Sequence, residues 1–209
     1  MRFHPVWCAL LLLATGIAQA ALPASLERFY AGLRSLQADF DQQVMDGHDK
    51  LVARGHGRLS VLRPGQFRWE YQSEGGDQLL VADGKNLWLY EKDLAQATVR
   101  AQSDASAATP MMLLSGDAAQ LEGAFMFAAL PGRNGLDRVE VRPRTASADF
   151  SSAVVSLRGA TLVSMEIRDK LGQAVTLRLS GLRRNPTLSA TVFKFTAPAG
   201  VDVIGTAIP

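Results

Sequence analysis

The sequence predicts a mainly β fold, an antiparallel sandwich or barrel, and three observations support this class. Apolar and polar residues alternate with a period of two in many short runs after residue 38, as strands with two unlike faces require. Gly, Pro, Asn and Asp separate these runs at hairpin spacing. Helical segments are too few to fill the interior of so wide a sheet, so a curled sheet with an apolar interior is expected to enclose a cavity.

Residues 1–20 are predicted to be a cleaved secretory signal peptide. Arg2 and His4 precede an apolar run at residues 7–17, and Ala18-Gln19-Ala20 supplies a small-x-small cleavage site. The run is too short to favour the alternative, a membrane anchor. Cys8 is the single cysteine and lies near the front of this run. The mature chain is therefore expected to be exported, free of disulfides and without a lipid anchor.

The composition after residue 20 favours one globular domain, residues 21–209. Cleavage removes Arg2 from the 22 basic residues, against 20 acidic ones, so the mature net charge is about +1 and a basic nucleic-acid-binding surface is not expected. The length suffices for one core. No second long apolar segment follows the signal peptide, so no membrane span is predicted.

A helix is predicted at residues 25–37. Its apolar residues fall at helical spacing, Ser25 is the expected N-cap, and Glu27 lies in the first turn, where the helix dipole favours an acid. The residues that carry the pattern are Leu26, Phe29, Tyr30, Leu33 and Leu36.

Strands are predicted from residue 38 onward, where the period changes to two. Gly55 and Gly57 lie inside the second strand and suggest a bulge or a sharp bend. Arg63-Pro64-Gly65 and Asp83-Gly84 are expected turns. The first group of predicted strands covers residues 38–44, 51–62, 66–72, 78–82, 86–90 and 96–101.

Residues 103–121 interrupt the strand pattern and are expected to be helical. Pro110 is placed for a first helical position, and Asp117 can cap a second short helix that ends at Leu121. Met111 and Met112 stand beside two leucines, a soft apolar surface of the kind used where the bound shape varies. Core packing is the alternative, which composition alone favours. Strands then resume at residues 124–130, 136–142, 153–157, 162–168, 173–182 and 191–195.

Aromatic residues gather around one turn. Phe67, Trp69 and Tyr71 are spaced two apart, so a regular strand places all three rings on one face. Arg63 lies at the end of the neighbouring strand, beside that face. Trp88 and Tyr90 also share a face, but the spacing does not say whether it points inward.

The residues do not predict catalysis. His48 and His56 are the histidines of the mature chain, and their spacing is not a recurrent metal-ligand pattern. Nucleophile-elbow, P-loop and dinucleotide-binding motifs are not found in the sequence. We therefore expect no enzyme, no catalytic residue, no metal and no cofactor.

An ordered set of motifs resembles the LolA family of periplasmic outer-membrane lipoprotein carriers. The motifs extend over most of the chain after residue 20. They are Arg63-Pro64-x-x-Phe67-x-Trp69, Val81-x-Asp83-Gly84-Lys85-x-x-Trp88-x-Tyr90, Phe40-Asp41-Gln42, Thr109-Pro110-Met111-Met112-Leu113-Leu114 and Phe193-Lys194-Phe195-Thr196-Ala197-Pro198-Ala199-Gly200-Val201.

The resemblance implies an incomplete, unclosed β-barrel with a helical lid and a hydrophobic cavity. The implied protein is a monomeric periplasmic carrier that receives lipoproteins from an inner-membrane ABC-type release complex (LolCDE-like) and delivers them to an outer-membrane receptor (LolB-like). In the family the residue matching Arg63 holds the empty lid shut. The residues implied to contact acyl chains are Phe67, Trp69, Met111, Met112 and Leu114.

Three alternatives stay open within this resemblance. A paralogue could carry another lipid or a glycolipid in an export pathway. The anchored receptor shares the barrel, but the position of Cys8 disfavours it. A lipoprotein-sensing module would add a second domain, for which the chain lacks the length. The chain departs from the family pattern at three places, none of which touches the inferred cavity: Ser73-Glu74-Gly75-Gly76, Glu91-Lys92-Asp93 and the C-terminal region after Val203.

Overall fold

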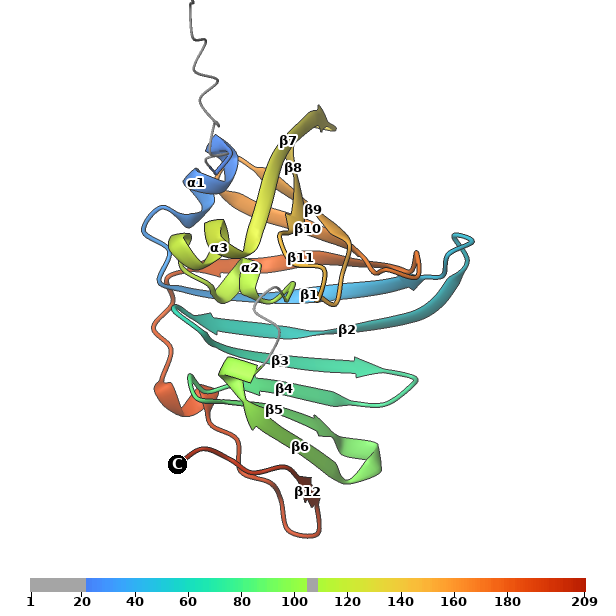
Figure 1. The fold of residues 1–209 in the computed structure, drawn as a ribbon, viewed down its shortest axis with the longest axis vertical. Coiled ribbons are helices and arrows are strands. Elements are labelled where there is room, and N and C mark those ends of the chain that lie inside the picture. Colours follow the sequence, from blue (N-terminus) through green and yellow to red (C-terminus); the bar gives the residue numbers. More distant parts are fainter. Residues whose placement is uncertain (1–21, 105–108) are drawn as a thin grey trace, which may run out of the picture.

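A computed structural model describes residues 22–104 and 109–209, and it confirms a mainly β architecture with few helices (Figure 1). The predicted signal peptide, residues 1–20, and residues 105–108 of the predicted helical segment lie outside the described residues. In the described residues the strands form one sheet, and three short α-helices gather near one end of its strands (Figure 1).

The elements follow one another in an order close to the predicted one. The helices are α1 (Ala24–Tyr30), α2 (Met112–Ser115) and α3 (Ala118–Ala124), with short 3₁₀ turns η1 (Lys92–Leu94), η2 (Gln102–Asp104) and η3 (Ala190–Phe193). The strands are β1 (Ser35–Met45), β2 (Leu51–Leu62), β3 (Gln66–Ser73), β4 (Gln78–Ala82), β5 (Asn86–Glu91), β6 (Gln96–Ala101), β7 (Phe125–Arg133), β8 (Leu136–Pro143), β9 (Ser152–Arg158), β10 (Thr161–Arg168), β11 (Ala174–Arg184) and β12 (Asp202–Ile204).

The sheet is long and open. Its strand order is β12-β6-β5-β4-β3-β2-β1-β11-β10-β9-β8-β7. Strand β11 returns beside β1, whereas β7 and β12 stand at opposite ends, so the barrel is not closed. Neighbouring strands are antiparallel except at β12, which runs parallel to β6. The unclosed antiparallel sheet predicted with the family resemblance is confirmed.

The two faces of the sheet differ in chemistry. Leu36, Val61, Phe67 and Ala82 stand in register across β1 to β4, and none is more than 7% exposed. Leu113, Leu114 and Leu121 of the helices belong to the same apolar cluster. We call this side the inner face. The alternate residues point the other way and include the ion pairs Asp39–Arg58 and Arg68–Glu70, as the two-residue period of a strand requires.

The helix predicted at residues 25–37 is shorter than expected, and its cap is different. It ends at Tyr30, Gly32 has φ +64°, and β1 begins at Ser35. Pro23 occupies the N-cap position without a side-chain hydrogen bond, and Ser25 is buried inside the helix. The apolar pattern extended too far because the buried residues that follow belong to a strand: Leu36, Ala38 and Phe40.

Strand β2 has no bulge at Gly55 or Gly57, so the first of the two predicted alternatives, a bulge or a sharp bend, is wrong. Both residues pair regularly with β1 and β3. A Cβ on Gly57 would lie 1.9 Å from the carbonyl oxygen of Glu70 and 2.6 Å from the Phe40 ring. A Cβ on Gly55 would lie 2.4 Å from the ring of Tyr71. These glycines therefore leave room for rings that lie across β2.

The C-terminal segment differs from the prediction. Residues 191–195 contain a 3₁₀ turn rather than a strand, because Ser189 Oγ accepts from Thr191 N and caps η3. The last strand is β12, which the alternation pattern did not predict. Phe195 packs on Trp88 and Tyr90, with ring centroids 5.3 and 5.5 Å away. The face shared by Trp88 and Tyr90 therefore points away from the inner face and is covered by the chain's own C-terminal segment.

The predicted helical segment forms two short helices. Helix α2 begins at Met112, so Pro110 lies before the helix rather than at its first position. Asp117 caps α3 as predicted, and its carboxylate accepts from Gln120 N while the Gln120 amide accepts from Asp117 N. We call Met112–Ala124, which contains α2 and α3, the lid. The name denotes a cover over the apolar cluster.

Candidate functional site

Five of the six residues singled out from the sequence meet in the apolar cluster between the lid and the inner face. Phe67 and Leu114 are buried members of it, at 7% and 2% exposed. Trp69, Met111 and Met112 are partly buried and pack against it. The lid side chains therefore share one apolar cluster with the aromatic residues of β3. Arg63, the sixth residue, reaches the lid from the turn between β2 and β3.

Arg63 joins three segments that are distant in sequence. Its Nε donates to the carbonyl oxygen of Gly116, between α2 and α3, at 2.9 Å, and its Nη2 donates to the same oxygen. Its Nη1 donates to the carbonyl oxygen of Leu33 at 3.3 Å. Its backbone N–H donates to Arg34 O at 2.8 Å. One guanidinium thus connects the β2–β3 turn, the lid and the segment after α1.

Other carbonyl groups at the end of α2 also have partners outside the helix. Gly65 N donates to Ser115 O at 2.9 Å, and the Tyr30 hydroxyl donates to Leu113 O at 2.6 Å. The last carbonyl groups of any α-helix lack partners within it, so a helix of four residues depends on such donors. The lid is held through carbonyl oxygens that α1 and the β2–β3 turn satisfy.

Burial affects the two donors differently. It lowers the pKa of Arg63, while the nearby Tyr30 and Asp117 act to raise that pKa. Burial raises the pKa of Tyr30 well above its ordinary value, and Arg63 opposes that rise. Both shifts leave the neutral-pH forms unchanged, a cationic guanidinium and a protonated phenol. Both groups can therefore donate to the lid at neutral pH.

The sequence indicated neither Tyr30 nor Phe40 as a site residue. Tyr30 appeared as one apolar position of a helix, although the Arg63 guanidinium lies over its ring, 4.9 Å from the centroid. Phe40 appeared within a family motif without a role, yet it stacks on Trp69 with centroids 3.9 Å apart. Each contact joins residues far apart in the chain, so no local pattern could reveal it.

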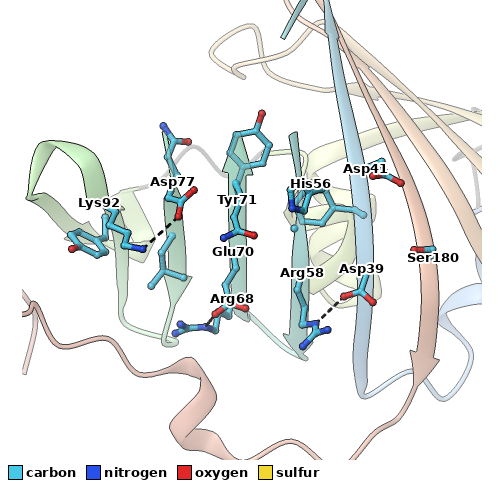
Figure 2. Close-up of a pocket in the computed structure, with 16 residues that line it drawn as sticks. Asp39, Asp41, His56, Arg58, Arg68, Glu70, Tyr71, Asp77, Lys92 and Ser180 are labelled. Atoms are coloured by element: carbon cyan, nitrogen blue, oxygen red, sulfur yellow. Dashed lines mark hydrogen bonds and ion pairs between the residues drawn. The ribbon is translucent and has the colours of Figure 1, made fainter. Parts of the chain in front are cut away.

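A pocket of about 720 Å³ that includes many charged residues in its lining lies on the face opposite the inner face (Figure 2). Its lining includes the ion pairs Asp39–Arg58 and Arg68–Glu70, and Lys92 approaches Asp77 at 3.6 Å. Figure 2 shows these charged side chains spread across several neighbouring strands. None of the six residues singled out from the sequence lines this pocket.

Metal-ligating side chains do not cluster in the described part of the chain. Within residues 22–104 and 109–209, His, Cys, Asp and Glu side chains do not gather in groups of three or more that could hold a metal ion. No helix within those ranges is both long enough and apolar enough to cross a membrane.

Sequence comparison connects the chain to one family. Residues 31–196 match the family model described as outer membrane lipoprotein carrier protein LolA. A protein of Methylibium petroleiphilum named outer-membrane lipoprotein carrier protein is 41% identical over 98% of this chain and 99% of its own length. A protein with the same name from Alkalilimnicola ehrlichii is 38% identical over 89% of this chain and 85% of its own length. Another, from Neisseria meningitidis serogroup C, is 34% identical over 93% of this chain and 92% of its own length.

The fold has a solved counterpart as well. An uncharacterized conserved protein from Thermus thermophilus superposes with a TM-score of 0.52 over 86% of this chain and 95% of its own, at 15% identity. That level of identity supports the shared fold alone. The family match and the relatives above extend over nearly the whole chain, and this chain therefore belongs to the LolA family of outer membrane lipoprotein carrier proteins.

Proposed function

We propose that this chain is a periplasmic carrier that shields the acyl chains of lipoproteins bound for the outer membrane. It takes them from a release complex at the inner membrane and passes them to a receptor at the outer membrane. The names of its relatives support the cargo class. The partners and the monomeric state follow from the family resemblance, and the predicted signal peptide supports the compartment.

The need for such a carrier follows from solubility. A triacylated lipoprotein carries three chains of about sixteen carbons each, and each buried methylene contributes about 0.8 kcal/mol. Exposing all of them to water would cost on the order of 35 kcal/mol. Unassisted crossing of an aqueous compartment is therefore negligibly slow, and a soluble protein with an apolar interior removes that barrier.

The observation that carries the proposal is the bond between Arg63 and the lid carbonyl of Gly116, directly beside the apolar cluster. A hydrogen bond to a charged group contributes about 1.5–3 kcal/mol. That energy is large enough to favour a closed lid when no cargo is bound. It is small enough for the burial of a few methylenes to exceed it.

The cargo displaces the lid side chains from the inner face in this proposal. Leu114 belongs to the same apolar cluster as Phe67, and Met111, Met112 and Trp69 pack against that cluster. An acyl chain entering beneath the lid takes the same apolar contacts, so the face stays covered in both states. Methionine side chains are unbranched and adapt to a ligand of variable shape.

Analysis of the protein purified from the periplasm tests the proposal directly. We expect mass spectrometry to find triacylated lipoproteins bound to it, because they are the proposed cargo. A different lipid or a glycolipid in their place would support the paralogue alternative. Purification with no bound lipid, together with failure to take lipoprotein from inner-membrane vesicles that contain the release complex, would overturn the carrier proposal.

A further inference from the structure

We propose that Tyr30 is a second latch of the lid, separate from Arg63, through the hydrogen bond that its hydroxyl donates to the backbone of α2. The proposal rests on the lid opening inferred under the proposed function. Tyr30 is the last residue of α1, and Leu113 lies 83 positions later in the chain. Their contact at 2.6 Å is a direct polar link between α1 and α2.

Helix α1 is anchored to the sheet, which makes it a fixed support for this bond. Arg184 of β11 donates to the carbonyl oxygens of Phe29 at 2.7 Å and Ala31 at 3.1 Å. The side chain of Asn185 donates to Gly32 O at 2.9 Å and accepts from Arg34 N at 2.8 Å. These bonds satisfy the C-terminal end of α1 and the chain that follows it. The structure thus ties α1 to β11 independently of the lid.

The lid is attached to α1 and to the β2–β3 turn through separate carbonyl oxygens. Tyr30 binds Leu113 O, whereas Arg63 binds Gly116 O. Gly65 N binds Ser115 O between them. Because the acceptors differ, removing one donor leaves the other bonds able to form. A buried carbonyl oxygen without a donor raises the free energy of the closed state, and contact with water removes this cost. Loss of the Tyr30 hydrogen bond therefore favours the state in which the lid has moved away from α1.

The substitution Tyr30→Phe isolates the hydroxyl. Phenylalanine keeps the ring that packs on Phe29 and lies under the Arg63 guanidinium, so the apolar contacts and the cation–π contact persist. Tyr90→Phe is the matched control, because the ring of Tyr90 packs on Phe195 on the opposite face, away from the lid. Arg63→Leu and the double variant with Tyr30→Phe test whether the two latches are separate.

Hydrogen exchange of the empty protein measures lid opening without any cargo. The reporters are lid amides whose acceptors lie within or next to the lid: Ser115 N, Gly116 N and Leu121 N. We expect Tyr30→Phe to speed the exchange of these lid amides about fivefold, the effect of one neutral hydrogen bond. The exchange rates of β1 and β2 amides should not change in this variant. In the Tyr90→Phe protein the lid amides should exchange as in the wild type. In the double variant the two single effects should multiply.

Three outcomes of this experiment would contradict the second latch. Lid exchange that is unchanged in Tyr30→Phe, or already unprotected in the wild type, would show that the hydroxyl does not hold the lid. Faster exchange throughout the sheet would show a general loss of stability instead. If the lid amides of the double variant exchange no faster than those of Arg63→Leu, Tyr30 acts through Arg63. If the lid amides respond as expected, but the protein purified from the periplasm has no bound lipid and takes up no lipoprotein, the carrier proposal fails and the second latch stands.

Discussion

The ring of Phe40 stacks on the indole of Trp69, with centroids 3.9 Å apart and planes inclined by 25°, although β2 runs between their strands. Gly57 makes this contact possible. It stands opposite Phe40 on one side and Tyr71 on the other, and it has no side chain to separate the rings. The aromatic lining of the inner face therefore depends on a residue that contributes no side chain to it.

Gly57→Ala tests this dependence. The added methyl meets the Glu70 carbonyl oxygen at 1.9 Å and the Phe40 ring at 2.6 Å, so the backbone or the ring must shift. We expect a loss of about 3 kcal/mol in the free energy of unfolding, at the upper end for overpacked sites, measured by urea denaturation. Gly123→Ala is the control, since nothing lies within 4 Å of its Cβ position. Because Gly123 lies in helix α3, where alanine is favoured over glycine, this control should raise the free energy of unfolding by up to about 1 kcal/mol. Equal stability of both variants would contradict the packing account.

Arg63→Leu tests the latch in transport. Removal of the guanidinium makes the closed, empty state less stable. Because that state competes with the cargo-bound state, the balance shifts toward bound cargo. The variant should therefore take up lipoprotein but release it roughly tenfold more slowly or worse. Transfer of labelled lipoprotein to receptor-containing membranes measures release. Arg58→Leu, which changes an exposed ion pair on the opposite face, should transfer normally. Normal transfer by Arg63→Leu would remove the latch from the mechanism.

Phe195→Ala tests the cover over Trp88 and Tyr90. The variant loses the ring that packs on both residues, and we expect a loss of about 2 kcal/mol in the free energy of unfolding, since the ring is partly buried. In a Trp69→Phe background, Trp88 is the remaining tryptophan after residue 20. Its fluorescence should shift to longer wavelength as water reaches the indole. An unchanged spectrum would mean that other residues shield Trp88.

The carboxylate of Asp83 should make stability depend on pH. Burial acts to raise its pKa, but hydrogen bonds from Asn86 and Lys85 outweigh burial and lower the pKa below 3.8. Since the folded pKa is the lower one, the carboxylate stabilises the fold above pH 3.8, and this contribution is lost as the pH falls toward the folded pKa. Asp83→Asn should therefore lower the free energy of unfolding by about 1 kcal/mol at pH 7. This difference from the wild type should shrink as the pH falls into the acid range. A constant gap from about pH 7 to about pH 3 in urea titrations would contradict this.

The sequence by itself determined strands β1 to β11, most turns and the family. Alternation along β1 to β6 is a local property, because one face of each strand packs on the core and the other meets polar surroundings. Asp83-Gly84 and the capping residue Asp117 also act on neighbouring residues. Such signals act within a few positions and can be interpreted without knowing which strands pair.

Only the tertiary structure decided which side of each strand is inner. Spacing shows that Trp88 and Tyr90 share a face, but the direction depends on Phe195, more than a hundred positions away. The end of α1 depends likewise on Asn185, and the Tyr30 bond depends on Leu113. The physical reason is that a local pattern records what each side chain requires, water or apolar contact. Which distant segment supplies that contact is fixed only when the chain folds.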